Sequence, residues 1–353
     1  MTLFDSPDFE GHEGVHAFFD EKTGLKSIIA VHSTARGPAA GGCRMWDYSS
    51  ADAAVTDALR LSKGMSYKNA MADLDFGGGK AVILGDARSQ KTPELFEAFG
   101  RAVDSLNGQY WTAEDVGVSP ADLVSTRRTT RYVAGLEGHA AASGDPSPVT
   151  AEGVFRGVRL CVQRALNRDL NGVTVAIQGV GHVGAYLAEK LHAAGAKLII
   201  ADVNQHALDE VAAKTGARIV STDAIFDVDA DVFAPCALGG AISATTLPRL
   251  KVKVIAGAAN NQLADKTIGQ AVFERGILYA PDYVINGGGI INVAGEIRAL
   301  EAGVAFDPDW VATKLDRLAV TLDEVLDHSL NDKRAANLVA DEIARARIAA
   351  ART

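Results

Sequence analysis

Hydrophobic residues along the first half of this chain follow two periods. Apolar, β-branched runs predict short strands at 27–32, 80–84 and 109–112. Residues 48–64 instead carry apolar side chains at helical spacing, and Gly64 is expected to interrupt that helix. A second helix is predicted over 92–108, because Thr92-Pro93 is a typical helix start and Asn107-Gly108 a typical end. Strands and helices therefore alternate from the start.

The second half repeats this alternation after a break. Residues 136–148 are small, contain Pro and Gly, and show no period, which indicates a crossing between domains. Strands are then expected at 173–177, 197–201, 231–235 and 252–256. Helical patterns lie between most of them, which is typical of a parallel doubly wound sheet. We predict an α/β protein with one domain over 1–135 and another over 136–329, the closing helix at about 330–353 packing back on the first.

Composition narrows the classes of function. The 353 residues carry a formal net charge of −9, and Lys and Arg are scattered, so no basic face for nucleic acid is expected. No apolar run reaches the roughly 18 residues of a membrane span, and the N-terminus lacks signal-peptide features. The three cysteines, Cys43, Cys161 and Cys236, are far apart, which favours a reducing cytoplasm. We expect no metal site, because no Cys/His cluster has ligand spacing.

A nucleotide-binding motif follows the strand at 173–177. The segment is G-x-G-x-x-G, with Gly179, Gly181 and Gly184 around Val180, His182 and Val183. The first glycine permits a tight turn, the second lets a pyrophosphate approach the helix N-terminus, and the third lets helix and strand pack closely. Asp202 ends the next strand about 20 residues later, where a carboxylate can bind ribose hydroxyls and repel a 2′-phosphate. The motif favours NAD over NADP.

Lys80 raises a different question, because it opens an apolar strand. Burying an ammonium group costs several kcal/mol in lost hydration free energy unless a partner group compensates for it. A lysine at the end of a strand usually extends its amine to water. Lys68, taken alone, would be a solvated charge on the surface of a helix. However, glycines at 77–79 leave space around the amine, and the strand before Asp115 places that carboxylate where α/β proteins bind ligands. We therefore predict Lys80 to be a neutral general base.

Several sequence blocks together resemble the glutamate/leucine/phenylalanine/valine dehydrogenase family, and most closely its leucine and phenylalanine branch. The blocks are "GPAAGGCRMW", "GMSYKNA", "GGGKAVI", "TAEDVG", "PSPVTAEGV", "APCALGG", "AGAANNQL" and "YAPDYVINGGG". The resemblance implies NAD-dependent, reversible deamination of an L-amino acid to a 2-oxo acid and ammonia. It also implies an N-terminal α/β domain with a mixed sheet that mediates homo-oligomerisation, a C-terminal Rossmann domain, and a cleft between them. We expect a dimer rather than an octamer.

The resemblance also implies residue roles. Lys80 and Asp115 correspond to the catalytic pair, and Lys68, with Gly42 and Asn261, to the site of the substrate carboxylate. The side-chain pocket by match comprises Ala40, Ala113, Ile290 and Val293. Further cofactor neighbours by match are Thr150, Cys236, Ala237 and Asn260.

Substrate choice stays open at this stage. The pocket residues are apolar, so glutamate is disfavoured. Ala40 stands where leucine-type members usually have leucine, which enlarges the pocket. We expect branched-chain amino acids, leucine first, with phenylalanine as the alternative. Two other classes are a non-catalytic NAD-binding protein and a hydroxy-acid dehydrogenase, but the first should lack the lysines and the second should show a His/Asp pair with a carboxylate-binding Arg.

Overall fold

The computed structural model describes residues 3–351 and divides into two compact units. Unit 1 contains the chain through Asp145, residues 290–311, and the segment from Ala344 onward. Unit 2 contains Pro146–Gly289 and Ala312–Ile343. The chain thus leaves the first unit twice and returns to it twice.

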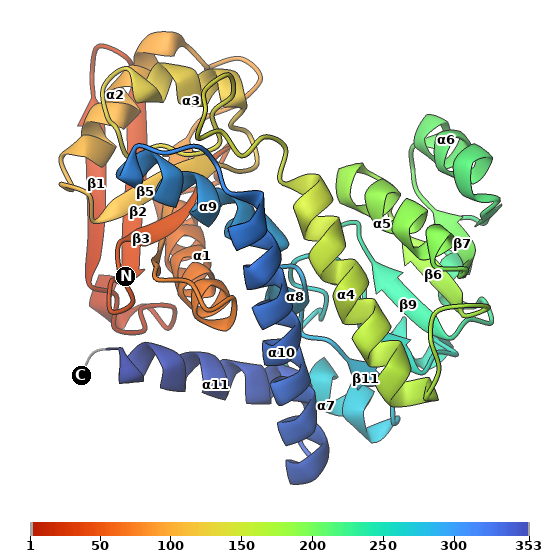
Figure 1. Ribbon diagram of the computed structural model, residues 1–353. Helices are drawn as coiled ribbons and strands as arrows, with labels where there is room; N and C mark the ends of the chain where they lie inside the picture. Colours follow the sequence, from red (N-terminus) through yellow and green to blue (C-terminus); the bar gives the residue numbers. More distant parts are fainter. Residues whose placement is uncertain (1–2, 352–353) are drawn as a thin grey trace. The chain divides into compact units, whose positions relative to one another are not determined.

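Unit 1 is built on a five-stranded mixed sheet with the order β1-β2-β4-β3-β5 (Figure 1). The strands are β1 (Gly14–Asp20), β2 (Leu25–Ser33), β3 (Ala39–Trp46), β4 (Gly77–Leu84) and β5 (Tyr110–Glu114). β2 pairs antiparallel with β1 and β4, whereas β3 pairs parallel with β4 and β5. The mixed sheet expected for the first domain is confirmed.

Helices cover both faces of this sheet. They are η1 (Leu3–Asp5), α1 (Ala51–Met71), α2 (Pro93–Asp104) and α3 (Pro120–Arg127). Successive side chains of a strand point to opposite faces. In β4, Val82 therefore packs under α1 beside Ala58, while Ile83 packs under α2 beside Phe96. By the same alternation, Lys80 lies on the α1 face.

Two local expectations are wrong. α1 continues through Gly64 to Met71, because tertiary packing of its last two turns outweighs the helix cost of one glycine of about 1 kcal/mol. The strand at Lys80 begins earlier, at Gly77, so the glycines belong to the sheet. A Cβ on Gly78 would lie 2.0 Å from the backbone nitrogen of Ser66, so α1 occupies the space that was expected to be open.

The first unit also includes α9 (Gly288–Ala302) from Ile290 onward, which differs from the predicted boundary at 329. The reason is Glu296, which is fully buried. Its carboxylate accepts the backbone N–H groups of Gly135 (2.9 Å), Leu136 (3.1 Å) and Ser143 (3.1 Å). These bonds fix the 135–143 segment to α9 within the same unit.

Unit 2 contains a six-stranded parallel sheet with the order β11-β10-β9-β6-β7-β8. The strands are β6 (Thr174–Gln178), β7 (Lys197–Ala201), β8 (Arg218–Ile219), β9 (Val232–Pro235), β10 (Val254–Ile255) and β11 (Leu278–Tyr279). When the strands are numbered along the chain, this is the order 3-2-1-4-5-6 of dinucleotide-binding folds. All strands are parallel, and the order in which successive strands join the sheet reverses between β6 and β9. The predicted doubly wound sheet is confirmed.

The helices of this unit lie on the sheet and along its margins (Figure 1). They are α4 (Ser147–Leu166), α5 (His182–Ala193), α6 (Gln205–Thr215), η2 (Ala224–Phe226), η3 (Leu247–Arg249), α7 (Ile268–Glu274) and α8 (Asp282–Ile285). α10 (Pro308–Asp332) and α11 (Ala336–Ala350) each contribute to both units. Over residues 3–351, none of the helices combines the length and apolarity needed to cross a bilayer.

Candidate active site

Lys80 and Asp115 form an ion pair in unit 1. Lys80 lies within β4 with only 5% of its surface exposed, and its Nζ donates a hydrogen bond to Oδ2 of Asp115. The second carboxylate oxygen, Oδ1, accepts the backbone N–H of Val116 at 2.7 Å. A buried ammonium is tolerated when a carboxylate compensates its lost hydration. The structure therefore brings together the two residues that were predicted to carry the chemistry.

β3 lies between the strands that carry this pair, so the side chain of Lys80 reaches across it. Gly42 of β3 makes that possible. A Cβ on Gly42 would lie 2.4 Å from the carbonyl oxygen of Glu114 and 3.0 Å from Cβ of Asp115. Any larger residue at this position would displace Asp115 from Lys80. Contacts within unit 1 therefore already explain why residue 42 is a glycine.

Competing effects set the charge of Asp115. Burial disfavours the ionised form, but the cations of Lys80 and Arg44 outweigh burial. With the hydrogen bond from Val116, they lower the pKa of Asp115 below its ordinary value. Asp115 is therefore a carboxylate at neutral pH and can accept a proton from a neighbour that is able to release one.

The other residues expected around the amino acid mostly lie in the same unit. Lys68 is half-buried in the last turn of α1. Ala40 and Ala113 are buried, with 1% and 7% of their surfaces exposed. The expected pocket residues of α9, Ile290 and Val293, are half-buried and also belong to unit 1. Asn261 is the exception, because it belongs to unit 2.

The glycine motif of unit 2 has the predicted geometry. Gly179 has φ +96°, a conformation that glycine adopts without strain and that makes the tight turn after β6. A Cβ on Gly184 would lie 2.1 Å from the carbonyl oxygen of Gly179, so α5 packs directly on the turn. Apart from Gly181 itself and its chain neighbours, no heavy atom of the described residues lies within 4 Å of a Cβ built on Gly181. Open space therefore exists where a phosphate was predicted to approach.

Asp202 lies directly after β7, beside this turn. Its Oδ2 accepts the N–H of Val180 at 2.7 Å, and its Oδ1 accepts the N–H of Asn204 at 2.9 Å. α5 begins at His182 with Gly181 as its N-cap, a residue that cannot supply a capping side chain. The first-turn N–H groups of α5 are thus positioned to bind an anion. These features fit a dinucleotide whose pyrophosphate meets α5 and whose ribose meets Asp202.

The remaining residues predicted near the cofactor also fall in unit 2. Cys236 follows β9 and donates its N–H to the carbonyl of Gln178 at 2.7 Å, and Ala237 adjoins Gly179. Burial raises the pKa of Cys236 to about 12, which favours the protonated thiol at neutral pH. Thr150 lies in the first turn of α4. Asn260 accepts a hydrogen bond from the amide of Asn286 at 2.8 Å.

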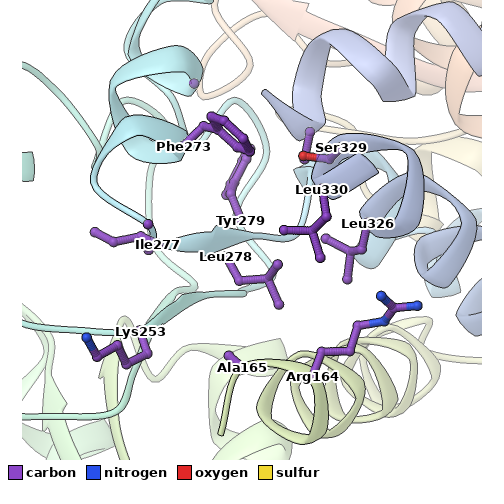
Figure 2. A pocket seen from close by; sticks show the side chains of 13 residues that line it. Arg164, Ala165, Lys253, Phe273, Ile277, Leu278, Tyr279, Leu326, Ser329 and Leu330 are labelled. Carbon is purple, nitrogen blue, oxygen red and sulfur yellow. The ribbon is translucent and has the colours of Figure 1, made fainter. Parts of the chain in front are cut away.

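A cavity of about 200 Å³ occupies another part of unit 2 (Figure 2). It lies between α4, β11 and α10, and its lining is largely apolar. The guanidinium of Arg164 at its margin is bound by Asp323 and by Asp327. None of the sequence-predicted site residues lines this cavity. It is therefore separate from the predicted cofactor and substrate residues.

Two residues beside the pair escaped the sequence analysis. Arg44 of β3 places Nη2 3.5 Å from Oδ2 of Asp115. Trp111 of β5 pairs in register with Ala40, is 3% exposed, and has an indole N–H without a hydrogen-bond partner among the described residues. Arg44 lies within the block GPAAGGCRMW, and Trp111 directly precedes the block TAEDVG. A strand assignment at 39–46 would have placed Arg44 on the face of Lys80, but the glycines of that segment obscured the strand. Trp111 lies in the predicted strand at 109–112, which gave no reason to assign it to the site.

Comparisons with known proteins agree with this geometry. The family description "Glu/Leu/Phe/Val dehydrogenase, dimerisation domain" matches residues 13–132. The description "Glutamate/Leucine/Phenylalanine/Valine dehydrogenase" matches residues 145–205 and 199–353. Together these matches span nearly the whole chain. An amino-acid dehydrogenase of this kind implies a nicotinamide cofactor.

Individual relatives cover most of the chain. Leucine dehydrogenase of Bacillus subtilis (strain 168) is 47% identical over 99% of this chain and 94% of its own. Phenylalanine dehydrogenase of Caldalkalibacillus thermarum (strain TA2.A1) is 48% identical over 84% of this chain and 82% of its own. The crystal structure of L-tryptophan dehydrogenase from Nostoc punctiforme superposes with a TM-score of 0.87, at 38% identity and complete coverage of both chains. The chain therefore belongs to the glutamate/leucine/phenylalanine/valine dehydrogenase family and is an amino-acid dehydrogenase.

Proposed function

We propose that this protein catalyses the NAD-dependent, reversible oxidative deamination of an apolar L-amino acid, leucine first, to its 2-oxo acid and ammonia. The observation that carries the proposal is the buried pair of Lys80 and Asp115. A lysine and a carboxylate in contact, on a sheet face that also carries apolar Ala40 and Ala113, suit a reaction that moves protons at the Cα–N group of an apolar amino acid.

The chemistry assigns one task to each residue. A bound nicotinamide ring would supply the acceptor for the hydride of Cα, whose loss leaves the substrate nitrogen double-bonded to that carbon. Lys80, in its neutral form, takes a proton at Nζ from the water that adds to Cα. As an ammonium, it then stabilises the oxygen that becomes the carbonyl of the 2-oxo acid. Asp115 passes the proton that Lys80 received on to the substrate nitrogen. Lys80 then takes the remaining hydroxyl proton as the carbonyl forms, and the nitrogen leaves as ammonia. Lys68 keeps its charge, because its task is an ion pair with the substrate carboxylate.

NAD is the proposed dinucleotide because of Asp202. Its carboxylate lies at the end of β7 and already accepts two backbone N–H groups, which fix its orientation. Each oxygen keeps a second lone pair for a ribose hydroxyl. A 2′-phosphate at the same place would meet a negative charge, which disfavours NADP. Thr150, Cys236, Ala237 and Asn260 are the further proposed neighbours of the cofactor, and Asn261 joins Lys68 and Gly42 at the substrate carboxylate.

We propose leucine ahead of phenylalanine because the large side chain of Trp111 offsets the pocket enlargement expected from the small side chain of Ala40. The two residues pair across β3 and β5, so their side chains point to the same side of the sheet. The indole of Trp111 therefore occupies space near that which Ala40 leaves. A difference of one methylene in such a pocket changes selectivity by about 1–3 kcal/mol. Several apolar substrates should thus react, with leucine favoured.

A kinetic panel tests the proposal. The purified protein is supplied with NAD and, in turn, leucine, valine, isoleucine, methionine, phenylalanine or tryptophan, and NADH formation is followed by absorbance. Leucine should give the highest kcat/KM. In the reverse direction, oxidation of NADH by 2-oxo-4-methylpentanoate should require ammonia, which a hydroxy-acid dehydrogenase would not need. Binding of NADH without turnover of any amino acid would refute the proposed reaction.

We further propose a cytoplasmic homodimer that associates through unit 1. The family description matched to residues 13–132 names a dimerisation domain. Large apolar side chains that unit 1 exposes include Phe19 at 68% and Trp46 at 54%. All three cysteines of the chain are free, which suits a reducing compartment. Light scattering after size exclusion should give twice the chain mass of 37.0 kDa, and a mass of eight chains would contradict the dimer.

A further inference from the structure

Arg44 connects the catalytic pair to a second carboxylate. Its Nη2 lies 3.5 Å from Oδ2 of Asp115, the same oxygen that Lys80 contacts. Its Nη1 lies 3.0 Å from Oδ2 of Asp57 on α1. The hydroxyl of Tyr48 donates to that same oxygen of Asp57 at 2.6 Å. One chain of contacts thus runs from Lys80 through Asp115 and Arg44 to Asp57.

We propose that Arg44 is a positioning residue for the proposed deamination, which holds Asp115 in place and keeps it ionised while Lys80 gains and loses its proton. The inference rests on the proposed function. It adds a residue whose guanidinium contacts Asp115 and Asp57 and which acts on the reaction through Asp115.

The argument begins with charge. Lys80 and Arg44 supply two cations, and Asp115 and Asp57 supply two anions, so the four side chains balance. When Lys80 becomes neutral during the reaction, Asp115 loses one of its two cationic partners. Arg44 keeps its proton under all working conditions, because a guanidinium does not deprotonate in proteins. It therefore remains as a fixed positive charge beside the proton that Lys80 and Asp115 exchange.

Geometry supports the same role. Arg44 is three-quarters buried, and its guanidinium uses different nitrogens for Asp115 and Asp57. Asp57 and Tyr48 anchor the far side of the guanidinium, so Arg44 presents Nη2 in one direction only. A lysine could supply the charge but not two nitrogens in a planar fork. Substituting Arg44 by lysine therefore keeps its charge but removes its geometry, whereas substituting it by glutamine removes its charge.

The test compares Arg44→Gln with Arg44→Lys over a pH series. Removing a cation near the Lys80–Asp115 pair makes the pair hold its proton more tightly. In Arg44→Gln, the pH limb, which is the part of the kcat/KM profile that rises with pH, should therefore shift to higher pH by about one pH unit. We expect kcat to fall about tenfold or more, while the amino-acid KM changes less than about threefold, because Arg44 does not bind substrate. Arg44→Lys should restore the pH limb but recover only part of kcat.

The matched control is Arg60→Gln. Arg60 lies on α1, pairs with Asp8 and is 65% exposed in its side chain, so its loss should leave both kcat and the pH limb unchanged. Tyr48→Phe removes one hydrogen bond to Asp57 without changing charge, and it should lower kcat slightly with no shift of the limb. Should Arg44→Gln fail to fold, judged by tryptophan fluorescence, the comparison of Arg44→Lys with wild type still tests positioning.

Other results would overturn the inference. An Arg44→Gln enzyme with a wild-type pH limb and a KM raised tenfold would instead make Arg44 a substrate ligand. A carboxyl ¹³C NMR titration of Asp115, assigned with Asp115→Asn, decides the matter without turnover. The pKa of Asp115 should be higher in Arg44→Gln than in wild type, and no difference would refute the role. If wild type oxidises no amino acid, the proposed function fails, yet this titration still reports on Arg44.

Discussion

Separating Lys80 from Asp115 should cost both stability and turnover, by different amounts on the two sides of the pair. In Lys80→Met, the carboxylate keeps Arg44 and the N–H of Val116, so we expect a loss of about 1–2 kcal/mol in the free energy of unfolding. In Asp115→Asn, the buried ammonium loses its carboxylate, and the loss should reach about 3 kcal/mol. The double variant should be less destabilised than the sum, with a coupling of about 1.5 kcal/mol or more.

The assay uses a favourable placement of tryptophan. All three tryptophans of the chain, Trp46, Trp111 and Trp310, lie in unit 1, so their fluorescence during urea unfolding reports on the unit that holds the pair. Turnover should fall about 10²–10⁴-fold in Lys80→Met, the usual effect of losing a general base. NADH binding should be retained, because the glycine motif lies in unit 2. Strictly additive stabilities, or turnover within tenfold of wild type, would refute the reasoning.

Three further predictions concern cofactor, substrate and pH. Asp202→Asn removes the charge but keeps an acceptor, so the ratio of kcat/KM for NADP to that for NAD should rise about tenfold; an unchanged ratio would mean that Asp202 does not meet the ribose. Ala40→Leu should lower kcat/KM for phenylalanine relative to leucine about tenfold, and equal effects on both substrates would remove Ala40 from the pocket. Burial lowers the pKa of His12 below 6.5 despite its contact with the carbonyl of Leu59. The unfolded chain therefore binds a proton first, and stability should decline as the pH falls below 6.5. His12→Gln should flatten that decline in urea midpoints between pH 7.5 and pH 5.5, and an unchanged slope would assign the decline to other groups.

Segments whose local pattern agrees with their surroundings were predictable from the sequence. The strand expected at 197–201 is β7, Lys197–Ala201, because four consecutive apolar residues follow Lys197 and turn residues bound the segment. α2 starts at Pro93 behind the Thr92 cap, as its side chain accepts the N–H of Leu95 at 3.1 Å. The glycine motif could also be predicted from the sequence, because a strand, a turn with positive φ at Gly179 and a helix follow one another within a dozen residues.

β3 shows where local pattern was insufficient. Its sequence, AAGGCRMW, has neither the alternation nor the β-branched residues of a typical strand, yet it pairs with β4 and β5 on either side. Its glycines are required by neighbours rather than by the strand itself, because Gly42 makes room for Glu114 and Asp115. Since such constraints come from segments far away in the sequence, no window around residue 42 could reveal them.

The sequence by itself therefore determined the fold class and the glycine turn, and it selected Asp202, Lys80 and Asp115 as candidate site residues. Only the tertiary structure decided which charges meet. Lys80 and Asp115 are 35 residues apart in the chain, and Arg44 and Asp115 are 71 apart. Whether those side chains touch depends on strand order and register, which are set by the packing of the whole unit. A buried charge is stable only where that packing supplies its partner, so the contacts of Asp115 with Lys80 and Arg44 became visible only in the folded chain.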